Sequence, residues 1–248
     1  MDLKEFFRQH PKAAIAFSGG VDSSYLLYAA LQCGADVRAY YVKGAFQPQF
    51  ELDDAQRLAR DIHAPMTVLR ADVLRDETVT ANPANRCYYC KKVVFSSIAQ
   101  AALADGYTLL LDGTNASDDA GDRPGMRALQ ELQVLSPLRL CGLTKPEIRR
   151  LSKEARLFTW DKPAYACLAT RIPTGEKITA EKLSATESAE GELFAMGFTD
   201  FRVRWYAGAA RLQFPAVQLP RVLERREEIL KKLKKYYPAV LLDLEVRG

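Results

Sequence analysis

The sequence predicts an α/β fold in which helices cover both faces of a parallel β-sheet, followed by a smaller α+β domain at the C-terminal end. In the first half of the chain, short apolar runs alternate with longer segments of helical periodicity. This alternation is typical of a parallel sheet, because each strand needs a crossover helix before the next one. Beyond residue 179 the order changes to helix, strand, strand, helix and strand. A chain of 248 residues accommodates two such domains, which we place at residues 1–172 and 173–248.

The elements of the first domain follow from the apolar pattern. Strands are predicted at 13–18, 36–42, 66–71 and 107–113, with a short one around Val134. Helices are predicted at 21–33, 48–62 and 87–104. Another helix is predicted from Thr144 to about Ala155. Thr144 and Glu147 have the spacing of a capping box, which is typical of a helix start. An irregular segment over 159–179 follows, and loops of this length are usually functional or act as linkers.

The second domain is predicted as a small α+β unit. Its elements are a helix at 180–196, strands at 201–206 and 210–214, a helix at 219–235 and a strand at 239–246. In the first of these strands, Arg202 and Arg204 alternate with apolar residues, so both arginines share one strand face. The pattern alone fits a solvated face as well as an anion-binding one.

Composition and charge exclude several classes of protein. Hydrophobic residues make up 48% and charged residues 27% of the chain, as in an ordinary globular protein. No apolar run reaches the roughly 20 residues that cross a bilayer, and the opening residues contain no apolar signal segment. We therefore expect a cytoplasmic protein without a membrane partner. The net charge of +4 suits a phosphorylated substrate but is too small for a concentrated nucleic-acid-binding surface.

The loop between the first strand and the first helix predicts a phosphate site. It reads Ser18, Gly19, Gly20, Val21, Asp22, Ser23 and Ser24. Two glycines let the backbone approach an anion closely, and the free N–H groups at a helix N-terminus favour phosphate. Ligands of parallel sheets bind at this carboxyl end of the strands. The loop lacks the Gly-Lys-Ser/Thr ending that accompanies γ-phosphoryl transfer, and its alternative is a plain tight turn.

This SGGVDSS loop resembles the PP-loop of the N-type ATP pyrophosphatase superfamily, which includes GMP synthetase, NAD synthetase and the tRNA-thiolating enzymes. The run DGTNASDD over 112–119 resembles a second superfamily element near the nucleotide. The resemblance implies a Rossmann-like fold of the adenine nucleotide alpha hydrolase-like type. It also implies that ATP, with Mg²⁺ neutralising its phosphates, adenylates a substrate oxygen while the loop holds the leaving pyrophosphate. The implied ATP and pyrophosphate ligands are Ser18, Gly19, Gly20, Val21, Asp22, Ser23, Ser24, Lys91, Gly113 and Asn115, with Asp22 also catalytic.

Three of the five cysteines form a candidate site. Cys87 and Cys90 stand where a helix is predicted to begin, and their spacing puts both thiols on one helical face. Cys167 lies in the irregular segment, whereas Cys33 and Cys141 are interpreted as packing thiols. Three thiolates can hold a 4Fe–4S cluster and leave one iron open, while structural zinc usually has four Cys or His ligands. A redox Cys-x-x-Cys pair and two unremarkable thiols are the alternatives, and an odd cysteine count argues against a disulfide framework.

The run over 118–179 resembles the LarE family of ATP-dependent sulfur transferases, and WDKPAYACLA over 160–169 is its most specific part. Membership implies that carboxylates of a pyridinium biscarboxylate mononucleotide become thiocarboxylates, a step toward the nickel-pincer nucleotide cofactor. An acyl-adenylate forms first, and a sulfur nucleophile then displaces AMP. Cys167 matches the catalytic cysteine that carries sulfur in the family. In one branch of the family, that cysteine donates its own sulfur. In the other branch, three cysteines, matched here by Cys87, Cys90 and Cys167, hold a cluster whose open iron carries sulfide.

The same resemblance assigns roles to several charged residues. Arg202 and Arg204, with Arg171 as a further candidate, are expected to bind the phosphate of the mononucleotide. Lys91 is expected to neutralise the nucleotide phosphate, although an exposed helix lysine is its alternative. Glu190 matches one member of a carboxylate pair that binds metal in the family, but no Asp or Glu occurs over 211–223, so a second metal site is not expected.

Four alternatives remain at the level of sequence. A tRNA thiolase shares the PP-loop but needs an extended basic surface, and an amidotransferase-type synthetase has no use for the three cysteines. A nucleotide-sensing module with structural zinc leaves the phosphate loop without a chemical step. The fourth is a version of the same sulfur transfer in which Cys167 is consumed. We expect the cluster-dependent enzyme, supplied by sulfide or another sulfur donor, with no nucleic-acid partner and as a homo-oligomer.

Overall fold

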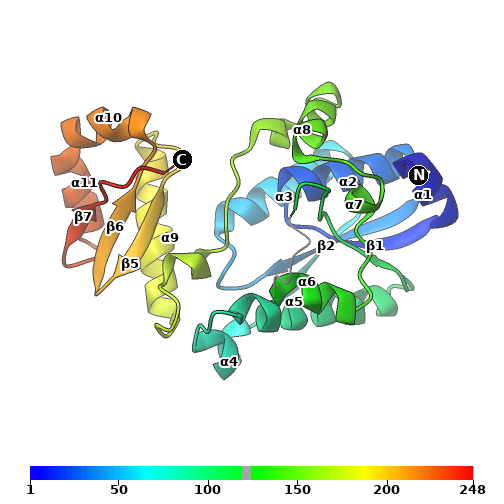
Figure 1. Ribbon diagram of the computed structural model, residues 1–248, viewed down its shortest axis with the longest axis horizontal. Coiled ribbons are helices and arrows are strands. Elements are labelled where there is room, and N and C mark those ends of the chain that lie inside the picture. Colours follow the sequence, from blue (N-terminus) through cyan, green and yellow to red (C-terminus); the bar gives the residue numbers. More distant parts are fainter. Residues whose placement is uncertain (119–123, 248) are drawn as a thin grey trace. The chain divides into compact units, whose positions relative to one another are not determined.

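The computed structural model describes residues 1–118 and 124–247 of the chain (Figure 1). The chain divides into two compact units. The N-terminal unit comprises Met1–Val73 and Asn85–Tyr165, and the C-terminal unit comprises Leu74–Ala84 and Ala166–Gly248. Residues 74–84 and 166–172, which the sequence predicts to lie in the first domain, thus pack with the second unit.

The N-terminal unit contains a four-stranded parallel sheet in the order β3-β2-β1-β4. The strands are β1 Lys12–Ala16, β2 Asp36–Lys43, β3 Met66–Arg70 and β4 Leu110–Leu111. The crossover helices are α2 Val21–Gln32, α3 Gln49–Asp61 and α5 Arg86–Ala104. The α/β fold predicted from the alternation is confirmed. The strand predicted around Val134 is reduced to one parallel bridge, in which Leu135 pairs with Leu111.

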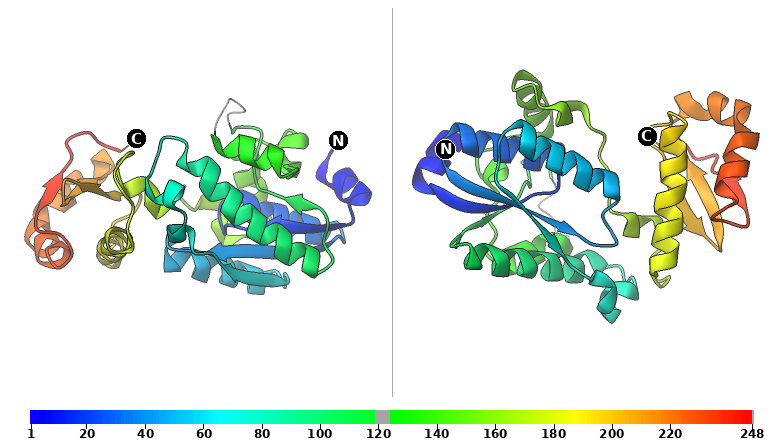
Figure 2. Two further views of the ribbon diagram at one scale, coloured as in Figure 1. Left: turned by 90° about the horizontal axis from the view of Figure 1, so that it is seen from below. Right: turned by 180° about the vertical axis from the view of Figure 1, so that it is seen from behind.

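Helices cover both faces of this sheet because its central strands are apolar on both sides. Ala13 and Ile15 of β1 pack in the core on one face, and Ala14 between them packs in the core on the other. Figure 2 shows α2 and α3 along the first face and α5 along the second. The remaining helices of this unit are α1 Leu3–Gln9, α6 Pro124–Glu131, α7 Pro137–Leu140, α8 Lys145–Glu154 and the 3₁₀ turn η2 Phe158–Asp161.

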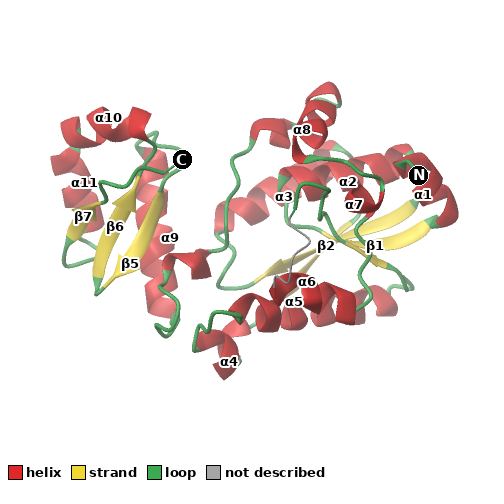
Figure 3. Cartoon of the chain, viewed as in Figure 1, coloured by secondary structure: helices red, strands yellow, loops and turns green. Residues whose placement is uncertain are grey.

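The C-terminal unit is a small α+β unit, as the sequence predicts (Figure 3). Its sheet has the order β5-β6-β7, with β5 and β6 antiparallel and β6 and β7 parallel. Its elements are η1 Val73–Arg75 at the boundary, α4 Glu77–Thr80, η3 Leu168–Arg171, α9 Ala180–Ala195, β5 Arg202–Tyr206, β6 Ala209–Gln213, η4 Ala216–Gln218, α10 Leu219–Glu224, α11 Arg226–Leu233 and β7 Val240–Leu242. A separate apolar core, built around Phe198, Phe201 and Phe214, stabilises this unit.

The single helix predicted at 219–235 is wrong, because two helices meet at Arg225. The backbone of Arg225 leaves helical geometry at φ −100° and ψ 18°. Its guanidinium donates to the carbonyl oxygen of Met196 at 2.7 Å and to the Glu228 carboxylate at 2.6 Å. These contacts hold the junction against the end of α9.

Asn82 explains why residues 74–84 belong to the C-terminal unit. Its buried amide donates to the carbonyl oxygens of Ile172, Pro173 and Glu176 at 3.3, 2.7 and 3.2 Å. The backbone carbonyl oxygen of Asn82 accepts from the N–H of Gly175 at 2.8 Å. The backbone of Asn82 is left-handed, with φ 56°, a conformation that asparagine tolerates better than most residues.

We expect the substitution Asn82→Ala to lower the free energy of unfolding of the C-terminal unit by about 2–3 kcal/mol, because three carbonyls lose their donor and alanine resists a left-handed backbone. Denaturant unfolding followed by tryptophan fluorescence measures the change, since Trp205 packs against the core of this unit. The variant Asn85→Ala is the control, because no side-chain cap hydrogen bond is formed at that helix start. A loss below about 0.5 kcal/mol would contradict this role.

Candidate active site

The glycine loop lies where the sequence predicts it, between the end of β1 and the start of α2. Gly19 has φ +72°, and a Cβ atom there would lie 3.0 Å from the Cβ of Ala55 in α3. The Ser18 and Ser23 hydroxyls lie 3.0 Å apart, and Ser23 Oγ donates to the carbonyl of Gly20 at 3.2 Å. The loop is therefore held by its own serines, and Gly19 is required by both backbone conformation and space.

The second motif packs directly against this loop. A Cβ atom on Gly113 would lie 2.8 Å from the backbone nitrogen of Ser23, so only glycine lets the chain after β4 approach α2 so closely. In the part of the chain that the structure describes, the fully buried hydroxyl of Ser24 has no hydrogen-bond partner. The motif over 112–119 is described as far as Asp118; Asp119 lies outside the described residues.

We expect Gly19→Ala to weaken ATP binding at least about tenfold, because the left-handed backbone costs about 1–2 kcal/mol and the new methyl group collides with Ala55. Titration calorimetry with an ATP analogue measures the affinity. Gly34→Ala is a matched control: Gly34 has φ +74°, but a Cβ atom there meets nothing within 4 Å. The control should lose stability without losing nucleotide affinity, and equal affinity losses in both variants would contradict the assignment.

Asp22 and Asn115, which are far apart in the sequence, meet beside the loop. The Asn115 amide nitrogen donates to Oδ1 of Asp22 at 3.3 Å, and the other oxygen, Oδ2, accepts from Nζ of Lys145 at 2.5 Å. Lys145 is the first residue of α8. The capping box predicted there is confirmed, since the N–H of Thr144 donates to Glu147 at 2.9 Å. That motif indicated a helix start, and no local pattern pointed to the ion pair with Asp22.

A second lysine that the sequence analysis missed reaches the same loop. Nζ of Lys162 lies 2.8 Å from the Asp54 carboxylate of α3 and donates to the carbonyl of Gly19 at 3.4 Å. The guanidinium of Arg149 donates to the carbonyl oxygens of Trp160 and Lys162 at 2.6 and 2.8 Å. These contacts fix residues 160–162 beside the glycine loop. The specific WDKPA run contained Lys162, but only the fold reveals its partners.

The cysteine pair lies at the start of a helix, as predicted. Cys87 and Cys90 occupy the first turns of α5; Cys87 is exposed and Cys90 is partly exposed. A guanidinium nitrogen of Arg86 lies 3.7 Å from the Cys87 sulfur. The Lys91 side chain runs along Gly125 of α6, where a Cβ atom would lie 3.2 Å from its Cε. Within residues 1–118 and 124–247 the structure shows no hydrogen bond or ion pair of Lys91.

Cys167 lies in the C-terminal unit, directly before η3. Its carbonyl oxygen accepts from the N–H and the hydroxyl of Thr170 at 3.0 and 2.8 Å. Arg171 donates to the carbonyl of Ala166 at 2.9 Å and forms a two-pronged pair with Glu190 at 2.8 and 3.2 Å. Both charged side chains are almost fully buried. Arg171 therefore holds the Cys167 loop through Glu190, which also accepts from the N–H of Val203 at 3.0 Å.

Arg202 and Arg204 extend the positive charge beside this loop. Arg204 donates to the carbonyl of Thr170 at 2.8 Å, and Arg202, only 4% exposed, donates to that of Phe201 at 2.6 Å. Burial, followed by the nearby charges of Arg171 and Arg247, lowers the pKa of Arg202 to about 10. Burial and the same cations also lower the pKa of Arg204. The solvated-face interpretation is wrong for Arg202, because its side chain is buried.

The three predicted cluster ligands are divided between the units, with Cys87 and Cys90 in the N-terminal unit and Cys167 in the C-terminal unit. Among the described residues there is no group of three or more His, Cys, Asp or Glu side chains placed to hold a metal ion. Likewise, none of the helices in the described ranges has the length and apolar character needed to span a membrane.

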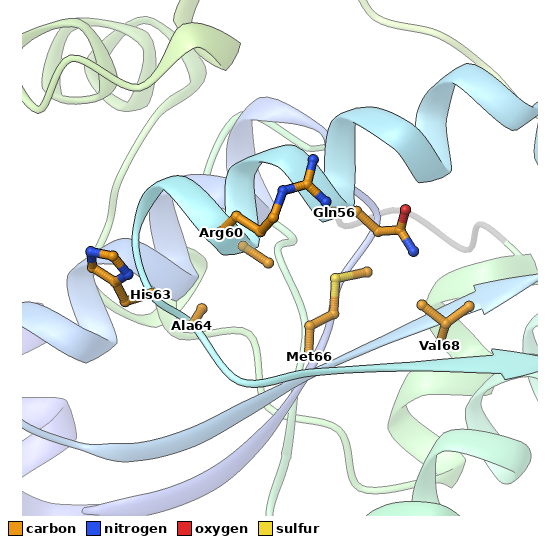
Figure 4. Close-up of a pocket in the computed structure, with 7 residues that line it drawn as sticks. Gln56, Arg60, His63, Ala64, Met66 and Val68 are labelled. Atoms are coloured by element: carbon orange, nitrogen blue, oxygen red, sulfur yellow. The ribbon is translucent and has the colours of Figure 1, made fainter.

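A surface groove between α3 and β3 lies apart from these residues (Figure 4). Figure 4 shows Gln56 and Arg60 on α3, Met66 and Val68 on the edge strand with their side chains directed toward the helix, and His63 at one end. None of the predicted site residues lines this groove.

Comparison with other proteins identifies the family. No protein-family model matches the chain. An uncharacterized protein of Synechocystis sp. is 35% identical over 249 residues, which cover 98% of this chain and 92% of that protein. The pyridinium-3,5-bisthiocarboxylic acid mononucleotide synthase of Lactiplantibacillus plantarum is 30% identical over 236 residues, which cover 94% of this chain and 86% of the synthase. The chain belongs to the LarE family.

As a LarE-family member, the chain is an enzyme of the ATP-dependent sulfurtransferase type. A tRNA-specific 2-thiouridylase, MnmA of Thermotoga sp., is 25% identical over 189 residues, which cover 58% of this chain and 52% of that protein. This shorter match supports the PP-loop superfamily and agrees with the parallel sheet of the N-terminal unit. The similarity to the LarE synthase, in contrast, extends through both units of the chain.

Proposed function

We propose that this LarE-family enzyme uses ATP to convert the carboxylates of a pyridinium biscarboxylate mononucleotide into thiocarboxylates. The observation that carries the proposal is the similarity to the pyridinium-3,5-bisthiocarboxylic acid mononucleotide synthase over 94% of the chain. The product would serve in the synthesis of the nickel-pincer nucleotide cofactor. The glycine loop, the buried arginines and the cysteines each supply a part of this chemistry.

The first step is adenylation at the N-terminal unit. A substrate carboxylate oxygen attacks the α-phosphorus of ATP, the bond from that phosphorus to the bridging oxygen breaks, and pyrophosphate leaves with the electron pair. Ser18 to Ser24 and the start of α2 would bind the pyrophosphate through N–H groups and hydroxyls. Gly113 permits the close approach of Asn115, and Lys91 would add positive charge.

Asp22 would hold the Mg²⁺ that accompanies ATP. Its carboxylate is a hard oxygen donor of the kind that Mg²⁺ prefers, and 22% of the side chain is exposed beside the loop. Bound Mg²⁺ supplies charge neutralisation for the phosphates. Asn115 orients the carboxylate through the hydrogen bond to Oδ1.

The second step is sulfur transfer. A sulfur nucleophile attacks the acyl carbon of the acyl-adenylate, the carbon–oxygen bond to the phosphate breaks, and AMP leaves. We propose that Cys87, Cys90 and Cys167 hold a 4Fe–4S cluster, since thiolates are its usual protein ligands and all three thiols are at least partly exposed. Such a cluster would supply a transferable sulfide, which free sulfide or another donor would replenish.

The substrate phosphate would bind at Arg202 and Arg204, where buried positive charge favours an anion. Arg171 is engaged by Glu190 and by the Cys167 loop, so we assign it to positioning that loop. Glu190 has the same positioning role, and no metal role is proposed for it. We further propose that the enzyme acts as a cytoplasmic homo-oligomer without a nucleic-acid partner.

The reaction is tested with purified protein, Mg²⁺, ATP, the pyridinium biscarboxylate mononucleotide and sulfide under anaerobic conditions. Pyrophosphate release that depends on the mononucleotide, with a product in which sulfur replaces carboxylate oxygen by mass spectrometry, is the expected result. Pyrophosphate release that instead depends on transfer RNA, with thiolated RNA as the product, would replace this function by tRNA thiolation.

The cluster is tested by iron and acid-labile sulfide per chain after anaerobic purification. About four of each are expected, with loss of both in Cys87→Ala and Cys167→Ala. Cys33→Ala and Cys141→Ala are matched controls, because they remove free thiols outside the proposed ligand set. A colourless protein that cannot be reconstituted with iron and sulfide would overturn the cluster. Dehydroalanine at residue 167 after turnover would identify the consumed-cysteine version.

A further inference from the structure

The Asp22 carboxylate has a cationic partner from another part of the fold. Nζ of Lys145 lies 2.5 Å from Oδ2 of Asp22, although the two residues are separated by 123 positions. We infer that Lys145 is a built-in counter-ion that keeps Asp22 closed to free divalent cations until nucleotide phosphates draw the ammonium away. This inference rests on the proposed ATP and Mg²⁺ site.

The main chain of Lys145 is held by hydrogen bonds, whereas its side chain is partly exposed. The backbone N–H of Lys145 donates to the Ser117 hydroxyl at 2.9 Å, in the loop that follows β4. The neighbouring residue Thr144 is locked by its capping box with Glu147. The side chain of Lys145 is 33% exposed, and a lysine ammonium sits on a flexible four-carbon stem. Lys145 can therefore exchange one anionic partner for another without movement of α8.

Charge decides the order of binding. Both oxygens of Asp22 are occupied in this state, Oδ1 by Asn115 and Oδ2 by Lys145. Without nucleotide, a metal ion that binds Asp22 must displace the Lys145 ammonium. The displaced ammonium then has no anionic partner and repels the metal. When ATP is present, its phosphates offer Lys145 a new anionic partner close to the loop, and Asp22 becomes available. Metal and nucleotide should therefore strengthen each other's binding, by the same factor in both directions.

The test measures Mn²⁺ binding to the full chain by electron paramagnetic resonance, without nucleotide and without turnover. Lys145→Met should bind Mn²⁺ up to roughly fivefold more tightly than the wild type, because the competing cation is gone. Lys145→Arg keeps the charge and should retain weak binding. Arg150→Met is the matched control, since Arg150 is on the same helix and pairs with exposed Glu154. Asp22→Asn in the Lys145→Met background should abolish the gain.

A second measurement adds an ATP analogue whose α- and β-phosphorus atoms are joined by a methylene group. In the wild type the analogue should strengthen Mn²⁺ binding, and in Lys145→Met the gain should be smaller. Unchanged or weaker Mn²⁺ binding by Lys145→Met without nucleotide would overturn the counter-ion role. A wild type that binds no analogue even with Mg²⁺ would instead overturn the proposed ATP site, so the two failures are distinguishable.

Discussion

Replacing Cys167 by alanine is expected to abolish sulfur transfer while pyrophosphate release continues. The thiol is a proposed ligand of the cluster that would supply the transferable sulfide, and loss of such a group lowers a rate by at least about a thousandfold. The loop itself should survive, because the contacts of this residue with Thr170 use its backbone carbonyl. Thiocarboxylate formation by mass spectrometry and pyrophosphate release measured on the same sample separate the two steps.

Two controls make this result specific. Cys33→Ala and Cys141→Ala remove thiols from the N-terminal unit and should retain both activities. Thr170→Val removes the hydroxyl that donates to the Cys167 carbonyl and should reduce transfer only in part. Sulfur transfer by Cys167→Ala at more than about a tenth of the wild-type rate would show that the transfer does not depend on this thiol.

Glu190→Leu is expected to lower the free energy of unfolding of the C-terminal unit by about 3–5 kcal/mol, because it leaves the buried Arg171 charge without its carboxylate. The N–H of Val203 also loses an acceptor. Urea unfolding monitored by tryptophan fluorescence measures the change. The double variant Arg171→Met and Glu190→Leu should be more stable than Glu190→Leu alone, since both charges are removed together. A loss below about 1 kcal/mol in Glu190→Leu would show that the pair is not holding the unit.

The sequence was informative where structure depends on local pattern. Alternating apolar strands and helices specify the parallel sheet, and the motifs at two strand ends place Asp22 near Asn115 because parallel strands share one carboxyl edge. Lys145 and Lys162 were missed because each makes its decisive contact with a residue more than 100 positions away. On sequence alone they resemble ordinary surface lysines.

Other differences also arise from contacts distant in sequence. The apolar pattern continues through residues 219–235, but Arg225 turns toward the carbonyl of Met196 and the helix divides. The period-two pattern correctly puts Arg202 opposite the apolar core, but strand periodicity cannot reveal that Arg202 is itself buried.

The C-terminal unit is built from two separate segments of the chain, so it cannot be exchanged between relatives as one continuous piece. The chain passes between the units at residues 73–74, 84–85 and 165–166, so no single cut separates them. A chimaera that takes only residues 166–248 from a relative would receive the acceptor carbonyls of residues 172–176 without the asparagine that binds them. Functional chimaeras should therefore be recovered when residues 74–84 and 166–248 come from the same parent.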